Sequence, residues 1–236
     1  MDFTIQKIAE DIWSIEQQFV RAFLLEGQDN AILVDTCCGG DILAVCRSVT
    51  EKPITLITTH SDGDHIGCDH QFPRQYLHSA EFARYEAQGR GTAHAAPVEE
   101  GDTFSVGRYH LEVIRIPGHT PGSIALLDRK HRFLISGDTV QNGCIFMFGS
   151  GRDLEAFRGS IAKLEDKRQE GLFDVVYPAH GDAVVPADIL ADHLALADAV
   201  LGGTAVPAGP APDRFPETVK VYRHGRAQMY YAYRTE

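Results

Sequence analysis

In its N-terminal third the chain reads Ile54-Thr55-Leu56-Ile57-Thr58-Thr59-His60-Ser61-Asp62-Gly63-Asp64-His65-Ile66-Gly67. The first six residues are apolar or β-branched, which predicts a buried strand. The rest forms a loop in which two glycines permit tight turns. Four side chains of this loop can bind a metal, namely His60, Asp62, Asp64 and His65. Imidazoles and carboxylates crowded this closely favour one or two divalent cations, which balance the charge and fix the rings.

Three later strands are each followed by one more residue of the metal-binding type. The segments are Pro117-Gly118-His119-Thr120, Ser136-Gly137-Asp138-Thr139 and Pro178-Ala179-His180-Gly181. Taken alone, the first loop could hold ordinary exposed polar residues. The three later segments make that interpretation weaker.

Together these residues resemble the signature of the metallo-β-lactamase fold hydrolases, which is H-x-H-x-D-H followed by a single His, a single Asp and a last His. Here the first motif is His60-x-Asp62-x-Asp64-His65, and His119, Asp138 and His180 match the later positions in order. The resemblance covers residues 32–181, and five motifs in register are a specific signal. It implies an α+β fold, a four-layer αβ/βα sandwich of two mixed β-sheets flanked by helices.

The resemblance also implies a dinuclear metal site. One metal falls to His60, Asp62 and His119, the second to Asp64, His65 and His180, and Asp138 bridges the two. The cofactors expected are two divalent metal ions, with zinc as the usual metal of the family. Asp64 is also expected to act in catalysis by accepting a proton. Asp35, at the end of an earlier strand, matches a family residue that supports the metal loop, although it could equally be a polar group that closes the strand.

Asp62 departs from the family pattern, which usually has His at that position. An oxygen ligand there moves the site toward harder metals, so iron or manganese is also possible. The flavodiiron proteins resemble this chain more closely at the site, because they have a carboxylate at this position. No flavodoxin-like domain follows in the sequence.

Composition limits the other function classes. The chain has 236 residues, 44% of them hydrophobic, and a net charge of −11, which argues against nucleic acid as a partner. Five cysteines with no framework spacing predict free thiols. The sequence has no apolar run near the ~20 residues of a membrane span and begins without a recognisable signal peptide, so we expect a cytoplasmic protein that contacts no membrane.

We expect residues 1–236 to form a single domain. Residues 204–216 contain four prolines and predict an extended connector, and residues 218–233 predict a C-terminal hairpin added to the edge of a sheet. Residues 88–101 are loop-like and could cover a substrate, with Arg90 and His94 as possible contacts. The apolar run 145–148 could form a wall of the substrate pocket or belong to the core.

The predicted function is that of a metal-dependent hydrolase that uses a metal-bound hydroxide on a small-molecule ester, lactone, thioester, amide or phosphoester. A thioesterase of the glyoxalase II type is not expected, because it needs a further C-terminal helical domain. Two alternatives remain. The same ligand frame could serve an iron-dependent oxygenase or an oxygen or NO reductase, or the domain could bind metal without catalysis. The sequence does not identify the substrate or the oligomeric state.

Overall fold

Two β-sheets packed face to face form the centre of the protein. The structure is a computed structural model and describes residues 2–233. Phe23 and Val34 of the first sheet meet Leu111 and Leu126 of the second in one buried apolar cluster. Such a cluster arises because each strand turns alternate side chains toward the other sheet.

The first sheet has seven strands in sequence order, and its strands from β4 to β7 are parallel. They are β1 (Thr4–Ala9), β2 (Ile12–Gln17), β3 (Val20–Glu26), β4 (Ala31–Val34), β5 (Ile54–Ile57), β6 (Gln75–His78) and β7 (Ala95–Val98). The second sheet has six strands. In spatial order they are β14 (Val185–Pro186), β13 (Val175–Pro178), β11 (Phe133–Gly137), β10 (Ile124–Asp128), β9 (Tyr109–Arg115) and β8 (Thr103–Val106).

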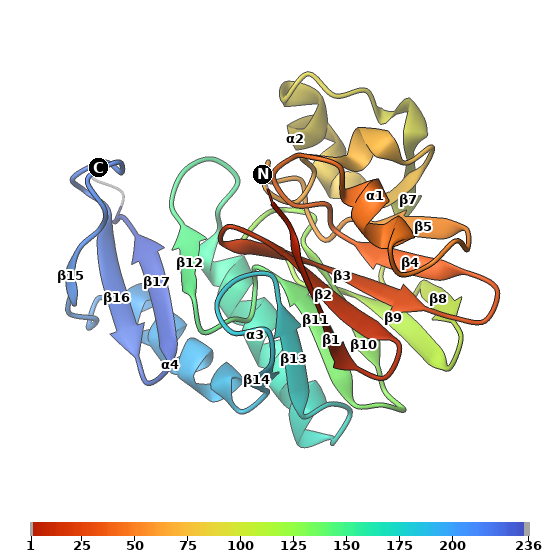
Figure 1. Ribbon diagram of the computed structural model, residues 1–236. Coiled ribbons are helices and arrows are strands. Elements are labelled where there is room, and N and C mark those ends of the chain that lie inside the picture. Colours follow the sequence, from red (N-terminus) through yellow and green to blue (C-terminus); the bar gives the residue numbers. More distant parts are fainter. Residues whose placement is uncertain (1, 234–236) are drawn as a thin grey trace.

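Helices cover the outer faces of both sheets (Figure 1). On the first sheet lie α1 (Ile42–Arg47) and α2 (Phe82–Ala87), with three short 3-10 turns, η1 (Asp69–Gln71), η2 (Ser79–Glu81) and η3 (Thr92–His94). On the second lie α3 (Leu154–Gln169) and α4 (Ile189–Leu201), whose apolar sides join the core behind β10 and β11. The helix–sheet–sheet–helix order confirms the predicted four-layer sandwich.

The predicted C-terminal hairpin is present, but it joins a separate small sheet rather than either large sheet. It forms a separate four-stranded sheet in the order β12 (Cys144–Met147), β17 (Ala227–Tyr231), β16 (Lys220–His224) and β15 (Gly209–Pro210). The reason is that β12 offers an unpaired edge, with which β17 pairs in parallel. In Figure 1 this sheet stands apart from the sandwich, next to α4.

The expectation that residues 88–101 form a loop was wrong over part of its length. Residues 95–98 form β7, which pairs in parallel with β6 at the edge of the first sheet. An edge strand tolerates Pro97, because its missing N–H is not needed by a further neighbour. Arg90 is held by an ion pair with the buried Asp69. This segment is therefore part of the sandwich rather than a lid.

The predicted ligand loops follow strands that end on one side of the sandwich. The Asp138 and His180 loops follow β11 and β13, which are parallel neighbours and therefore end together. Gly118 permits the His119 loop to pack on α3, because a Cβ atom at this position would lie 2.3 Å from the backbone of Phe157. Its φ of 132° also lies in the region that favours glycine.

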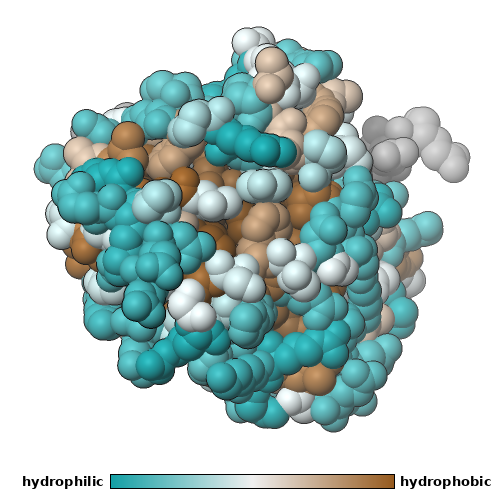
Figure 2. Space-filling view, turned by 90° about the vertical axis from the view of Figure 1, so that its right-hand side faces the viewer, coloured by the Kyte–Doolittle hydropathy of each residue, from teal (hydrophilic) through white to brown (hydrophobic). Residues whose placement is uncertain are grey.

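Figure 2 shows one side face, on which hydrophilic residues dominate and apolar residues show between them in the centre and in smaller patches nearer the edges. All five cysteines are free thiols, as the spacing predicted. Within residues 2–233, no helix has both the length and the apolar character needed to cross a membrane.

Met229 tests whether the third sheet unfolds together with the sandwich. Its side chain is fully buried in the cluster that also contains α3 and α4. We expect Met229→Ala to lower the free energy of unfolding by about 2–5 kcal/mol and to shift one cooperative transition, measured by denaturant titration. Arg223→Ala, at an exposed position of the same hairpin, should change it by less than about 0.5 kcal/mol. A separate early transition in the Met229 variant would show that the hairpin is an independent unit.

Candidate active site

Four histidine rings meet at the loop end of the sandwich, and the protein fixes each of them through its Nδ1 atom. The partners are Thr59 Oγ1 for His60 at 3.0 Å, Asp35 Oδ2 for His65 at 2.8 Å, the Phe146 carbonyl for His119 at 3.1 Å and the Phe19 carbonyl for His180 at 2.7 Å. The four Nε2 atoms are then left to face the carboxylates of the site.

The partners also determine which nitrogen carries the proton. A carbonyl or a carboxylate can only accept, so the Nδ1 atoms of His65, His119 and His180 donate. The hydroxyl of Thr59 donates to Asp35 Oδ2, which leaves its oxygen to accept from Nδ1 of His60. In their neutral forms all four rings therefore present an Nε2 lone pair, the form in which histidine binds a metal.

The ligand-type residues form two groups. His60, His119 and Asp138 form one, and Asp64, His65 and His180 form the other. Within each group the ligand atoms all lie within 4.8 Å of one another.

Asp138 lies between these two groups. Its Oδ2 atom is 3.3 Å from His119 Nε2 and 3.9 Å from His60 Nε2. Its Oδ1 atom is 3.1 Å from Nε2 of both His65 and His180. One carboxylate thus faces both groups, one oxygen to each.

The donor set fits divalent cations. Among the described residues, His60 Nε2, His65 Nε2 and Asp138 Oδ1 are buried without a hydrogen-bond partner, which is costly unless something else binds them. The pKa of His65 also reflects an excess of negative charge. Burial alone would lower it, but Asp138, Asp35 and Asp64 raise it well above its ordinary value. A cation at this point would bind the unpartnered atoms and balance the carboxylates.

Asp62 binds two arginines. Its Oδ1 lies 2.7 Å from Arg84 Nη2, and its Oδ2 forms an ion pair with Arg152. The same Oδ2 is 3.2 Å from His119 Nε2 and 3.6 Å from His60 Nε2. Asp62 is therefore near the first group, but both of its oxygens face guanidinium groups.

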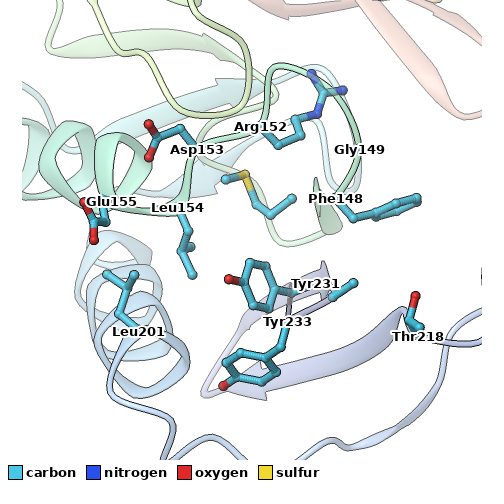
Figure 3. A pocket seen from close by; sticks show the side chains of 12 residues that line it. Phe148, Gly149, Arg152, Asp153, Leu154, Glu155, Leu201, Thr218, Tyr231 and Tyr233 are labelled. Carbon is cyan, nitrogen blue, oxygen red and sulfur yellow. The ribbon is translucent and has the colours of Figure 1, made fainter. Parts of the chain in front are cut away.

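A cavity of about 670 Å³ opens onto the two groups. It is lined by Phe19, Asp62, Gly63, Asp64, His119, Asp138, Cys144, Phe146, Arg152, His180, Gly181, Arg214, Phe215 and Tyr230. A volume of this size suits a small molecule. A second cavity of about 710 Å³ lies between α3, α4 and β17, with Tyr231 and Tyr233 opposite Leu154 and Leu201 (Figure 3). Its lining contains none of the histidines, and it shares only Arg152 with the first.

Comparison with known proteins agrees with this geometry. The family model of the metallo-beta-lactamase superfamily matches residues 16–224. The chain belongs to the metallo-beta-lactamase superfamily. The acyl-coenzyme A thioesterase MBLAC2 of Gallus gallus is 27% identical over 222 residues, which cover 75% of this chain and 80% of that protein. A hydroxyacylglutathione hydrolase of Pectobacterium carotovorum subsp. carotovorum is 31% identical, but the match spans only 57% of its length and 61% of this chain.

The solved structures support the fold. A metallo-beta-lactamase from Pontibacter korlensis superimposes with a TM-score of 0.71 at 19% identity, covering 84% of this chain and 99% of that one. Superfamily membership and the hydrolase relatives make this chain a metallo-hydrolase. The superfamily generally binds divalent metals, and the two groups described above could hold them.

Asp35 supports the loop that carries His60 and His65 through hydrogen bonds. Its Oδ1 accepts from the backbone N–H of Thr59 at 2.7 Å, and its Oδ2 accepts from Thr59 Oγ1 and from His65 Nδ1. Asp35 has a φ of 64°, which is strained for a residue other than glycine. The three hydrogen bonds hold it in that conformation, and so its supporting position agrees with the sequence expectation.

Glu81 connects two of the ligand loops, which the sequence did not predict. Its carboxylate is fully buried and accepts from the Ser61 N–H at 2.9 Å, from the Ser61 hydroxyl and from the Gly122 N–H at 2.7 Å. The His60 loop and the His119 loop are thereby joined. Burial alone would raise the pKa of Glu81, but the hydrogen bonds from Ser61 and the charge of His60 hold it below its ordinary value.

Arg21 attaches the loop that carries His180 to the first sheet. From β3 its Nη1 donates to the Pro178 carbonyl at 2.9 Å and its Nη2 to the Gly181 carbonyl at 3.0 Å. Its side chain is buried and paired with Glu16. The segment that carries His180 is thus attached to the first sheet. Neither Glu81 nor Arg21 stands in a motif, so no sequence signal could have found them.

The other histidines lie away from the cavity. His70 is exposed, and His193 is buried with Nε2 2.9 Å from the Gln141 carbonyl. His94 lies 3.0 Å from the Tyr85 hydroxyl. The possible substrate contacts of Arg90 and His94 are not supported, since neither lines the cavity.

Glu81 makes the joining of the loops testable. In Glu81→Gln an amide N–H₂ replaces one acceptor oxygen and faces donors. We expect the free energy of unfolding at neutral pH to fall by about 1–3 kcal/mol. Since the folded pKa lies below the unfolded value of 4.5, the carboxylate stabilises the fold above that pH, and this contribution is lost on acidification. The difference between parent and variant should therefore shrink below about pH 4.5.

The measurement is denaturant titration at several pH values in a chelator, so that loss of metal does not contribute. Glu86→Gln, at an exposed position of α2, is the matched control. A difference between parent and Glu81→Gln that stays constant down to acid pH would contradict the charged role of Glu81.

Proposed function

We propose that this metallo-hydrolase cleaves a small-molecule thioester, with esters and lactones as the related alternatives of the same carbonyl chemistry. The observation that supports thioesters is the match to acyl-coenzyme A thioesterases over three quarters of the chain, accompanied by matches to hydroxyacylglutathione hydrolases. Amides and phosphoesters remain possible substrates of such a site but have no comparable support.

The sequence motif assigned the first metal to His60, Asp62 and His119. We keep His60 and His119 as the residues that would hold it and leave Asp62 out, because its oxygens face Arg84 and Arg152. Asp64, His65 and His180 would hold the second metal, and Asp138 would be shared by both, as the motif indicated. Nitrogen and oxygen donors of this kind suit zinc, although iron and manganese also accept them. Divalent metals in such a site lower the pKa of water and polarise a carbonyl oxygen.

The protein supplies orientation and proton transfer. Asp64 is partly exposed in the cavity, with Oδ2 3.5 Å from His180 Nε2, so its carboxylate is placed to accept a proton from the attacking water. The water oxygen forms the new bond to the acyl carbon and the carbon–sulfur bond breaks. The electron pair leaves with sulfur, and the proton is returned to the thiolate. The products are a carboxylic acid and a thiol.

The iron-dependent alternative rested on Asp62 as an additional carboxylate ligand. Arg84 and Arg152 face both of its oxygens and balance its charge. Asp62 is therefore weaker support for iron than its place in the motif suggested. Elemental analysis of the native protein, with a test for redox activity, separates the two functions.

Hydrolysis and metal content can be tested together through Asp138. We expect the zinc-loaded protein to hydrolyse aryl thioesters, followed by release of thiol, and Asp138→Ala to lose both metals as well as turnover. The physical reason is that one carboxylate faces both groups and screens two cations from each other. Asp174→Ala, at an exposed position, is the control. A variant that retains two bound metals would show that Asp138 is not the bridge.

Arg152 provides a separate test of the first metal site. In Arg152→Gln, Oδ2 of Asp62 loses its cationic partner and is free to face a metal. We expect the weaker of the two metal-binding steps to tighten by roughly tenfold, because a positive charge has been removed from beside the site. The measurement is zinc titration against a competing chelator. Arg129→Gln, on the surface, should leave both steps unchanged. If Arg152→Gln weakens metal binding instead, Arg152 acts by holding the His119 carbonyl rather than by neutralising Asp62.

A further inference from the structure

The C-terminal part of the chain contributes an aromatic wall to the cavity. Because β12 and β17 pair in parallel, Phe146 stands opposite Tyr230, with ring centres 5.0 Å apart. Phe215, from the connector before the hairpin, lies 5.3 Å from Phe146 and 5.2 Å from Tyr230. All three rings are half-buried and line the cavity. We name Phe146, Phe215 and Tyr230 the aromatic wall.

Residues 145–148 therefore contribute both to the core and to the wall of the cavity, the two alternatives that the sequence left open. Ile145 and Met147 are buried in the core, whereas Phe146 faces the cavity and Phe148 packs on Phe215 at 5.0 Å. Alternate residues of a strand point to opposite sides, so one strand builds both the core and the wall.

A cation stands beside the aromatic wall. Arg214 is exposed and lines the cavity, and its guanidinium carbon lies 5.0 Å from the centre of the Phe215 ring. Within residues 2–233 it has no carboxylate at ion-pair distance, unlike Arg152 in the same cavity, which binds Asp62. In a chain of net charge −11, a cation without an anionic partner at the substrate cavity is a candidate anion-binding group.

The order of these features limits the substrate. The aromatic wall adjoins the metal-ligand groups at Phe146, whose carbonyl accepts from His119 Nδ1, and Arg214 lies against Phe215 of the same wall. Flat apolar groups pack favourably on aromatic rings, and a guanidinium binds a carboxylate through two parallel hydrogen bonds. We propose that the substrate carries a flat apolar group beside the scissile carbonyl and a carboxylate beyond it, which Arg214 binds. This inference names the substrate class of the site and rests on the proposed hydrolase function.

The proposal is tested by binding, independently of turnover. The probes are 4-acetylbenzoate and its neutral isostere 4-acetylbenzamide, two ketones that cannot be hydrolysed, titrated calorimetrically into the zinc-loaded protein. We expect the carboxylate to bind about fivefold more tightly than the amide, the upper range for an exposed ion pair. Arg214→Gln should remove this preference without changing the affinity for the amide. Phe215→Ala should weaken the binding of both probes, and Arg108→Gln, on the β8–β9 turn, should affect neither.

Turnover is then measured with the matched thioesters S-(4-carboxyphenyl) and S-(4-carbamoylphenyl) thioacetate. We expect Arg214→Gln to raise KM for the charged substrate alone and to leave kcat unchanged. Equal binding of the two probes by the parent, or a preference that persists in Arg214→Gln, would overturn the role of Arg214. An Arg214-dependent preference without any hydrolysis would leave the inference about the cavity standing and would refute the proposed function instead.

Discussion

The Nδ1 hydrogen bonds of four histidines are the constraint on which the rest of this structure depends. Each ring is held by an acceptor from a different part of the chain, including Phe19 in the turn between β2 and β3 and Phe146 in the third sheet. The rings are therefore oriented before any ligand binds. The entropic cost of fixing their rotamers arises during folding rather than on binding. Glu81 and Arg21 support the same loops without contacting the rings, through hydrogen bonds to backbone groups.

The site contains an excess of negative charge that must be balanced. Asp62, Asp64, Asp138 and Asp35 place four carboxylates close together in a protein that is already acidic. The raised pKa values of His65 and His180 reflect this excess of negative charge, and two arginines balance the charge of Asp62. The superfamily usually has a neutral His where this chain has Asp62, and the two arginines compensate electrostatically for that exchange. The unusual residue is thus accommodated by partners from α2 and from the turn before α3, which lie far from it in sequence.

The sequence predicted the candidate ligand residues because their motifs are local patterns, and the family resemblance carried by those motifs implied the sandwich. Strand-end motifs such as Pro117-Gly118-His119 can be recognised from a few consecutive residues. Arg84, Arg152 and Glu81 could not be found in this way, since their roles arise only when separate loops meet. The same holds for β7, where neighbouring strands overruled a composition rich in Ala and Pro, and for the hairpin, which paired with β12 because that edge was available.

The pairing of β12 with β17 has a consequence for the order in which the protein folds. The register joins Cys144 to Gln228, so the strand that carries Phe146 must wait for nearly the last residues of the chain. The histidines and aspartates, by contrast, are all present once residue 180 has been synthesised. Contacts of such long sequence separation form late, because the intervening segment must first be closed into a loop. The surface that would recognise a substrate is therefore completed only when residues 227–231 are made, and the hydrogen bond from His119 to the Phe146 carbonyl becomes fixed at the same stage.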